Sequence, residues 1–410
     1  MIDIDFFLFL FPAVMSLIWT SGAIWQYRSG EHRQRKGERP STLCLNEPVS
    51  LLIPCFNEAR QVTDTVTYAL SISQTNFEVI AIDDGSTDDT LEILNELATY
   101  HPQLRVVALG SNQGKAAALR AGAKVAQHPI LICIDGDARI DRDAPGWLVD
   151  RFLADPLLGA ATGNPRVRNR RSILTRLQVG EFSTIVGTIK RAQMRLGCLF
   201  TVSGVIAAFR KTAVEQVDYW TADALTEDID ITWKIQRAGW RACFEPRALV
   251  WILTPATWRG LWRQRLRWAM GGAQVMLRNV DVLVRAPHAG LRLLMMEMIA
   301  SVLWCYLLAL VSVGSLLHIV TTLLTGGTPE ITVGGGALIL LLLCLLQFAV
   351  GTLMDHRYDP TAWRSVMFIP LYPAAFWILQ FATTLVAYPK VLARRRGRPA
   401  TWISPDRGHP

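Results

Sequence analysis

The sequence contains no arrangement of cysteines or histidines that suits a redox centre or a zinc site. Its seven cysteines are scattered without a C-x-x-C pair, and none of its seven histidines lies in an H-E-x-x-H frame. An odd number of cysteines in mostly apolar surroundings predicts reduced packing residues. The chain therefore lacks the ligand spacing that is typical of zinc enzymes.

A dinucleotide-binding signature is also missing. After the first predicted strand, where G-x-G-x-x-G would stand, the sequence reads Pro54-Cys55-Phe56-Asn57-Glu58, which argues against a dinucleotide oxidoreductase. The net charge of +8 lies largely beside apolar segments, in residues 28–39 and 394–398. Lysine and arginine in such places mark the cytoplasmic side of a bilayer, so we interpret the basic runs as membrane-orienting and expect no nucleic-acid partner.

The composition predicts a catalytic domain combined with membrane segments. A hydrophobic fraction of 51% and a mean hydropathy of +0.25 are high for a soluble enzyme of 410 residues. Phe6 to Trp25 is a nearly uncharged apolar stretch of about 20 residues, with acids before it and a basic run after it. This order predicts a membrane anchor with its amino terminus outside, because a cleaved signal peptide would carry its positive charges first.

Six segments follow from these patterns. They are a transmembrane anchor (1–27), a basic cytoplasmic linker (28–48), a catalytic domain (49–255), amphipathic interfacial helices (256–290), transmembrane segments (291–393) and a basic tail (394–410).

Three apolar stretches in the last third of the chain, 293–324, 337–354 and 367–392, are able to enter a membrane. If all three cross, the basic tail lies outside, against the positive-inside tendency. Either one stretch lies in the membrane without crossing it, such as the one that carries Pro370 and Pro373, or the tendency fails here.

Strand and helix signals alternate from Val49 onward. Short apolar strands are predicted at 49–53, 77–82, 104–108 and 130–134, and helices at 63–73, 90–100 and 116–126. Repeated units of this length predict an α/β fold with a doubly wound, mostly parallel sheet that binds its ligand at the carboxyl ends of the strands. Farther on, tryptophans and arginines alternate in residues 257–284, which suits a helix at the headgroup level of a bilayer or an ordinary amphipathic helix packed on the domain.

Acidic clusters follow two of the predicted strands. Asp84, in a turn with Gly85, can accept hydrogen bonds from a base or a sugar, although Ser86 or Thr87 could simply cap the next helix. Lys115 opens a helix and can hold phosphate oxygens together with the amides of the helix end, although lysine is common at helix starts.

The second cluster predicts a cation site. Asp135 and Asp137 directly follow a buried-looking strand and can converge on one hard divalent cation that also binds diphosphate oxygens. An isolated D-x-D is often a turn, and the interpretation as a metal site depends on the ordered set of motifs.

Two further segments complete the set. In Thr226-Glu227-Asp228 an acid stands at the start of a predicted helix, where it either caps the helix or acts as a general base on a sugar hydroxyl. The segment Gln264 to Trp268 combines an amide, guanidinium groups and an indole within little more than one helical turn. Indole faces stack on sugar rings, and Arg267 can pair with diphosphate oxygens.

The D, D-x-D, T-E-D and Q-x-x-R-W elements in this order resemble the processive family 2 glycosyltransferases. Similarity covers roughly residues 45–408 and extends to Val202-Ser203-Gly204, Gly163-Asn164-Pro165-Arg166 and the closing stretch from Trp402 to Gly408, which are similar to the bacterial branch that makes poly-β-1,6-N-acetyl-D-glucosamine for biofilms. The resemblance implies the fold of nucleotide-diphospho-sugar transferases, with UDP-N-acetylglucosamine as donor and a growing polysaccharide as acceptor. The alternatives are a synthase of another β-linked polymer (hyaluronan, chitin or cellulose), a transferase that adds a single sugar to a lipid, or a membrane channel or sensor that binds nucleotide without reacting it.

The resemblance also implies roles for individual residues. Glu58 and Asp84 would hold uridine, Lys115 and Asp135 would contact the diphosphate, and Asp137 together with Asp135 would bind Mg²⁺, with Mn²⁺ as the alternative ion. Asp228 would be the catalytic base. The acceptor and the diphosphate would be contacted by Thr226, Glu227, Gln264, Arg267 and Trp268.

Partners are implied in the same way. Relatives work in the bacterial cell membrane with a cytoplasmic catalytic domain, a small membrane subunit and a response to cyclic di-GMP. Arg166, Arg168, Arg170 and Arg171 could contribute to such an anionic site, but a solvated basic turn is the favoured interpretation of loose arginines. The enterobacterial relatives carry an additional amino-terminal apolar segment that this chain lacks.

Overall fold

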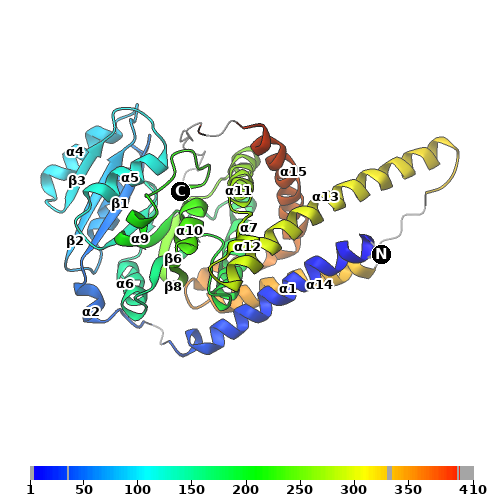
Figure 1. Cartoon of the computed structure of the whole chain (residues 1–410), viewed down its shortest axis with the longest axis horizontal. Helices are drawn as coiled ribbons and strands as arrows, with labels where there is room; N and C mark the ends of the chain where they lie inside the picture. Colours follow the sequence, from blue (N-terminus) through cyan, green and yellow to red (C-terminus); the bar gives the residue numbers. More distant parts are fainter. Residues whose placement is uncertain (1–3, 35–36, 330–334, 395–396, 398–410) are drawn as a thin grey trace.

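The computed structural model of the chain describes residues 4–34, 37–329, 335–394 and 397 and contains a sheet domain from which long helices extend to one side (Figure 1). Eight strands form one sheet in the order β3-β2-β1-β4-β7-β6-β8-β5. Their bounds are β1 Val49–Cys55, β2 Phe77–Asp83, β3 Leu104–Ala108, β4 Ile130–Ile134, β5 Arg139–Ile140, β6 Leu158–Val167, β7 Ile206–Arg210 and β8 Arg241–Ile252. Strands β3, β2, β1 and β4 are parallel, whereas β7 runs antiparallel to both β4 and β6. The predicted α/β fold with a mostly parallel sheet is confirmed.

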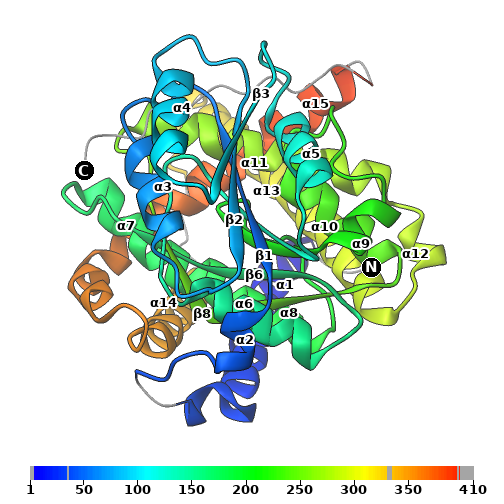
Figure 2. The same cartoon turned by 90° about the vertical axis from the view of Figure 1, so that its left-hand side faces the viewer.

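Helices cover both faces of the parallel half of the sheet. Figure 2 shows α3 (Val62–Leu70) and α4 (Thr90–Tyr100) on one side of β1 and β2, and α5 (Lys115–Val125) on the other. Side chains alternate accordingly, since Leu51 packs in the core under α3 and Leu52 in the core under α5. All seven residues of β1 are buried, and this explains why the strand reads as a continuous apolar run.

The remaining helices of the sheet domain pack mostly against β6, β7 or β8. They are α2 Thr42–Asn46, α6 Ala144–Ala154, α7 Ile173–Glu181, a π-helical turn Phe182–Val186, α8 Gly187–Arg195, α9 Lys211–Gln216 and α10 Glu227–Arg237, with a short 3-10 turn Glu31–Arg33 before them. Helix α8 packs against β8 on one side and against α1 on the other. It therefore separates the sheet from the first apolar helix.

Four helical stretches in the described part of the chain are long and apolar enough to cross a membrane. They are α1 Ile4–Ser29, α13 Ala289–Leu324, α14 Gly335–Asp355 and residues 375–393, which include α15 Ile378–Ala393. Helix α14 lies beside α1, and both extend away from the sheet together with α13 (Figure 1). The chain is thus built as a membrane protein.

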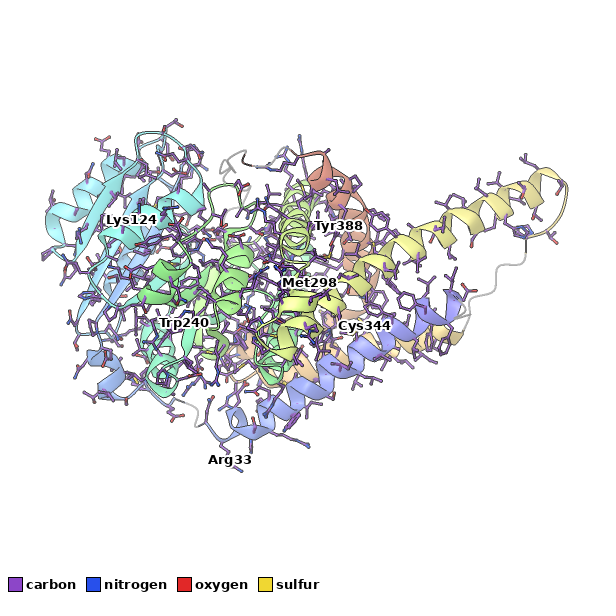
Figure 3. The ribbon with its side chains drawn as sticks, viewed as in Figure 1. Arg33, Lys124, Trp240, Met298, Cys344 and Tyr388 are labelled. Carbon is purple, nitrogen blue, oxygen red and sulfur yellow. The ribbon has the colours of Figure 1, made fainter. Side chains whose placement is uncertain are left out.

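Helix α15 follows a different course from these three. It packs along α11 (Trp258–Arg278), close to the sheet domain (Figure 1). Figure 3 labels Tyr388 of α15 and Met298 of α13. The ring of Tyr388 lies 6.4 Å from that of Tyr306 of α13, and its hydroxyl contacts Met276 of α11. Beyond α15, the N–H of Gly397 donates to Asp223, which lies just before α10. This hydrogen bond joins Gly397 to the sheet domain. The stretch before α15 is irregular, with Pro360–Leu371 and Pro373–Trp377 as 3-10 and π-helical segments, and α12 (Val282–Arg285) links α11 to α13.

The basic stretch that begins with Arg166 in β6 and continues into the following turn differs from its favoured interpretation. Arg166 is buried and pairs with Asp355 at the end of α14 at 2.7 Å, Arg168 pairs with Asp64 at 3.1 Å, and Arg170 pairs with Asp359. The prediction of a solvated turn is therefore wrong for Arg166, because its partner comes from a membrane helix far along the sequence.

Candidate active site

Asp84 is the first acid of the site and joins two loops at the edge of the sheet. Its side chain is fully buried after β2, and its two oxygens accept the N–H groups of Gln113 and Gly114, each at 2.8 Å, from the loop before α5. Burial raises the pKa of Asp84, and the two amide bonds oppose this shift. Gly85 has a φ of +71°, and a Cβ there would lie 2.4 Å from the backbone of Ser111. Only glycine lets the two loops approach this closely.

Glu58 lies in the loop after β1, against the second acidic cluster. Its side chain is buried and its N–H donates to the hydroxyl of Thr90 at 2.8 Å. A Cβ at Gly136, between the two aspartates of the D-x-D segment, would lie 3.3 Å from Cγ of Glu58. The loops after β1, β2 and β4 therefore meet at one edge, as expected for parallel strands.

Lys115 links Asp135 of the D-x-D segment to Glu227 of the T-E-D segment. Its Nζ lies 2.6 Å from Oδ1 of Asp135 and 2.7 Å from Oε1 of Glu227, and donates to the carbonyl of Gly204 at 3.2 Å. Burial alone would lower the pKa of Lys115, but the two carboxylates outweigh it and raise the pKa well above its usual value. The lysine stays charged and neutralises both acids.

Asp228 stands beside this ion pair at the amino end of α10. Its Oδ2 accepts the N–H of Gly204 at 3.1 Å and its Oδ1 accepts the N–H of Ile229 at 2.9 Å. Burial and the neighbouring Glu227 raise the pKa of Asp228 to about 6. For Glu227, burial is outweighed by Lys115 and by Arg267, so its pKa is lowered. Two adjacent carboxylates thus have different proton affinities, and Asp228 is the one suited to accept a proton near neutral pH.

The D-x-D segment supplies two carboxylates for a cation. Within the residues that the structure describes, there is no group of three or more His, Cys, Asp or Glu side chains that could hold a metal ion by itself. Asp137 is 4% exposed, and Asp135 lies beside it in sequence with Oδ1 directed at Lys115. Two carboxylates and the oxygens of a bound diphosphate would together satisfy a hard divalent ion, so these residues fit a cation that arrives with its nucleotide.

Helix α11 packs beside the T-E-D segment at the start of α10. The exposed Arg267 acts on Glu227 by its charge, and Gln264 has a buried amide oxygen without a hydrogen-bond partner among the described atoms. The indole of Trp268 packs against the hydrophobic core that lies under α3, and its ring centre lies 4.1 Å from the guanidinium of Arg265. The helix comes close enough to Thr226 for a Cβ at Gly271 to lie 1.9 Å from the threonine hydroxyl.

Three residues of this region were absent from the predicted site. Arg265 is buried, pairs with Glu181 at 2.7 Å and carries the Trp268 ring, a role that its place inside the Q-x-x-R-W segment could have suggested. Gly204 lies between the acids and Lys115, and it belongs to the Val202-Ser203-Gly204 stretch that carries part of the family resemblance. Lys190 has no sequence signal beyond its place among other basic residues.

Comparison with known proteins identifies the family of the chain. Residues 47–271 match the model of the glycosyltransferase like family 2. The poly-β-1,6-N-acetyl-D-glucosamine synthase of Staphylococcus aureus is 37% identical over 405 residues, which cover 98% of each chain, and that of Staphylococcus epidermidis is 37% identical over 420 residues with the same coverage. A solved mannosyltransferase from Pyrobaculum calidifontis, in complex with GDP-Man and Mn²⁺, has a similar fold, with a TM-score of 0.63 and 19% identity over 94% of this chain and 99% of the other. A family match over more than half of the chain and relatives of this identity over nearly its full length lead to one conclusion: the chain belongs to the family 2 glycosyltransferases.

Proposed function

We propose that the chain is a processive, inverting glycosyltransferase of the membrane that polymerises N-acetylglucosamine from UDP-N-acetylglucosamine into β-1,6-linked poly-N-acetylglucosamine. The observation that carries the proposal is the convergence of Asp135, Lys115, Glu227 and Asp228 around Gly204 within one site. The choice of donor and linkage rests on the likeness to the staphylococcal synthases.

The reaction is a single displacement at the anomeric carbon of the donor. The 6-hydroxyl oxygen of the chain end forms the new bond to that carbon, the bond to the diphosphate breaks, and Asp228 takes the hydroxyl proton. A β product from an α donor requires in-line attack, so the base and the diphosphate-binding groups must lie on opposite sides of the sugar. Lys115 bridges Asp135 and Glu227, the neighbour of Asp228, and this supports the assignment of Asp135 and Asp228 to different sides of the sugar.

Other residues bind and orient the two substrates. Lys115 holds its positive charge against the diphosphate and Arg267 reaches it from α11, while Trp268 stacks on the acceptor sugar. Glu58 and Asp84 shape the uridine side. Asp135 and Asp137 would hold Mg²⁺, or Mn²⁺ in its place, and the ion when bound would neutralise charge on the departing UDP.

The orientation in the membrane follows from the basic segments. Residues 28–39 lie between α1 and the sheet domain, so the positive-inside tendency places that domain in the cytoplasm of a bacterial cell, facing its inner membrane. Crossings by α1, α13 and α14 alone, with α15 lying beside α11, would leave Gly397 on the same side as the sheet domain, which agrees with its hydrogen bond to Asp223. The polymer then leaves through a path that the helices line, with a small membrane subunit as partner.

Cyclic di-GMP is a further partner implied by the family. We do not assign it to the basic stretch at the end of β6, because Arg166, Arg168 and Arg170 are already paired with carboxylates.

Substitution of the base tests the proposal directly. Asp228→Asn preserves the shape of the side chain but removes its ability to take a proton, so UDP binding should persist while polymer synthesis is lost. Purified protein incubated with radiolabelled UDP-sugars, followed by analysis of product size and linkage, identifies the donor. Synthesis by Asp228→Asn near the wild-type rate would refute the role of the base. Incorporation of another sugar, addition of a single sugar, or UDP binding without turnover would refute the assigned polymer.

A further inference from the structure

A buried lysine of α8 reaches the loop that holds the proposed base. Lys190 is 5% exposed, and its Nζ donates to the hydroxyl of Ser203 at 2.6 Å and to that of Thr162 at 3.4 Å. The ammonium also lies over the ring of Phe244, 5.9 Å from its centroid. Burying a lysine is costly unless its surroundings use the charge or the hydrogen bonds.

The hydroxyl of Thr162 fixes the direction of these hydrogen bonds. It donates to the carbonyl of Ile206 at 3.1 Å and accepts the N–H of Ser203 at 2.8 Å. The Thr162 oxygen therefore has one lone pair left, which accepts a hydrogen bond from the Lys190 ammonium. Both the backbone and the side chain of Ser203 are thus held by a network to which Lys190 belongs.

The next residue, Gly204, connects Ser203 to the active site through its backbone. Its N–H donates to Asp228 at 3.1 Å and its carbonyl accepts from Lys115 at 3.2 Å. A Cβ at Gly204 would lie 3.2 Å from each of Asp228 Oδ2, Glu227 Oε1 and Lys115 Nζ. The loop is wedged between these groups, so a shift of Ser203 would move the amide that orients the base.

We propose that Lys190 is a positioning residue for the acceptor-side base: it fixes the Ser203–Gly204 loop and, by its positive charge, keeps Asp228 oriented and ionised. This inference rests on the proposed role of Asp228. Lys190 is not a catalytic residue, because the loop lies between it and the reacting groups.

The charges around the base explain why the lysine matters. Asp228 faces Glu227 of its own helix, Lys115 of α5 and Lys190 of α8, while Arg267 of α11 acts on Glu227. Lys115 is shared with Asp135 and Glu227, so its charge is already neutralised. Burial lowers the pKa of Lys190 to about 7, and Asp228 opposes this shift. The lysine therefore carries its charge in the pH range in which Asp228 titrates.

The test uses the full-length protein, purified in detergent, with UDP-N-acetylglucosamine and Mg²⁺. Release of UDP gives kcat and KM between about pH 5 and pH 9 for the wild type, Lys190→Met and Lys190→Gln. We expect Lys190→Met to lower kcat about tenfold, to leave the KM for donor within about twofold, and to move the acid limb of kcat up by on the order of one pH unit. Lys190→Gln retains a hydrogen bond to Ser203 without the charge, so it should recover part of kcat but keep the shifted limb.

A third variant separates the two contributions. Ser203→Ala removes the contact of the loop but leaves the charge, and should lower kcat without moving the acid limb. A wild-type pH profile in both Lys190→Met and Lys190→Gln would overturn the inference. UDP binding by calorimetry verifies that each variant is folded, and if Lys190→Met does not fold, Lys190→Gln and Ser203→Ala carry the same comparison.

Asp228→Asn, measured in parallel, distinguishes the failure of this inference from failure of the proposed function. An inactive Asp228→Asn beside an unshifted Lys190→Met would overturn only the role of the lysine. An active Asp228→Asn would overturn the proposed base itself.

Discussion

The packing of α11 against α10 leads to a prediction with a built-in control. A Cβ at Gly271 would lie 1.9 Å from Oγ1 of Thr226 and 2.7 Å from its Cβ. A Cβ at the next residue, Gly272, would lie 3.5 Å from Cζ of Phe200, which is ordinary contact. Gly271→Ala and Gly272→Ala add the same methyl group to the same helix, yet only the first methyl meets the T-E-D segment.

The expected magnitudes differ for stability and for activity. Rotation of the Thr226 side chain moves its hydroxyl but not its Cβ, so the two helices must separate by on the order of 1 Å to reach normal contact. Overpacking costs about 1–3 kcal/mol and the gain in helix propensity returns about 1 kcal/mol, so the free energy of unfolding should fall by no more than about 2 kcal/mol. Displacement of Asp228 relative to Trp268 by the same distance should lower kcat by about 10²-fold.

Two measurements test this reasoning. Thermal unfolding in detergent reports stability, and UDP release with UDP-N-acetylglucosamine reports turnover. We expect Gly272→Ala to match the wild type in both, and Gly271→Ala to remain folded while losing most of its activity. Equal turnover by the two variants would refute the view that close packing of α11 on Thr226 sets the geometry of the site.

Three other predictions concern charge. Asp355→Leu leaves Arg166 and Arg191 buried with one carboxylate fewer, and should lower the free energy of unfolding by about 3–5 kcal/mol. Asp281→Asn removes only the exposed pair with Arg237 and should cost less than about 1 kcal/mol. Equal melting temperatures of the two variants would contradict this expectation. Burial and Glu227 raise the pKa of Asp228 to about 6, and the proposed base must be ionised to act. The value of kcat should therefore be constant above about pH 6 and fall about tenfold per pH unit below it. A fall of kcat that begins only near about pH 4 would argue against this base. Removal of divalent ions with EDTA should abolish UDP release and added Mg²⁺ should restore it, and full activity in EDTA would exclude a cation at Asp135 and Asp137.

Much of the fold was predictable because buried parallel strands leave a strong signal. The four predicted strands match β1 to β4 within two residues at each end, since each is a short apolar run between turns. The meeting of Asp84 and Asp135 at one edge also followed from the sequence, because parallel strands place their carboxyl ends together. Their individual roles remain predictions.

What escaped the sequence depends on partners that are distant along the chain. Arg166 reads as part of a basic turn, and only the position of α14 reveals Asp355 as its buried partner. Lys190 and Arg191 are adjacent basic residues for which the sequence suggests no partner, and both are buried, one toward the sheet and one against Glu31 and Asp355. Periodicity cannot assign such partners, because it reports which face is apolar but not what covers it.

The two sides of the site are supported by different parts of the molecule. The acids proposed to bind the donor lie on loops after β1, β2 and β4, within the parallel half of the sheet. The proposed acceptor side is formed by α10, α11 and α8, of which α11 packs on α15 and α8 on α1. Arg191, next to Lys190 on α8, ties that helix to α14 through Asp355. A processive synthase must exchange its donor at every cycle while keeping the end of the polymer aligned with the exit path. Attachment of the proposed base to the membrane helices, and of the proposed donor loops to the sheet, would meet both requirements.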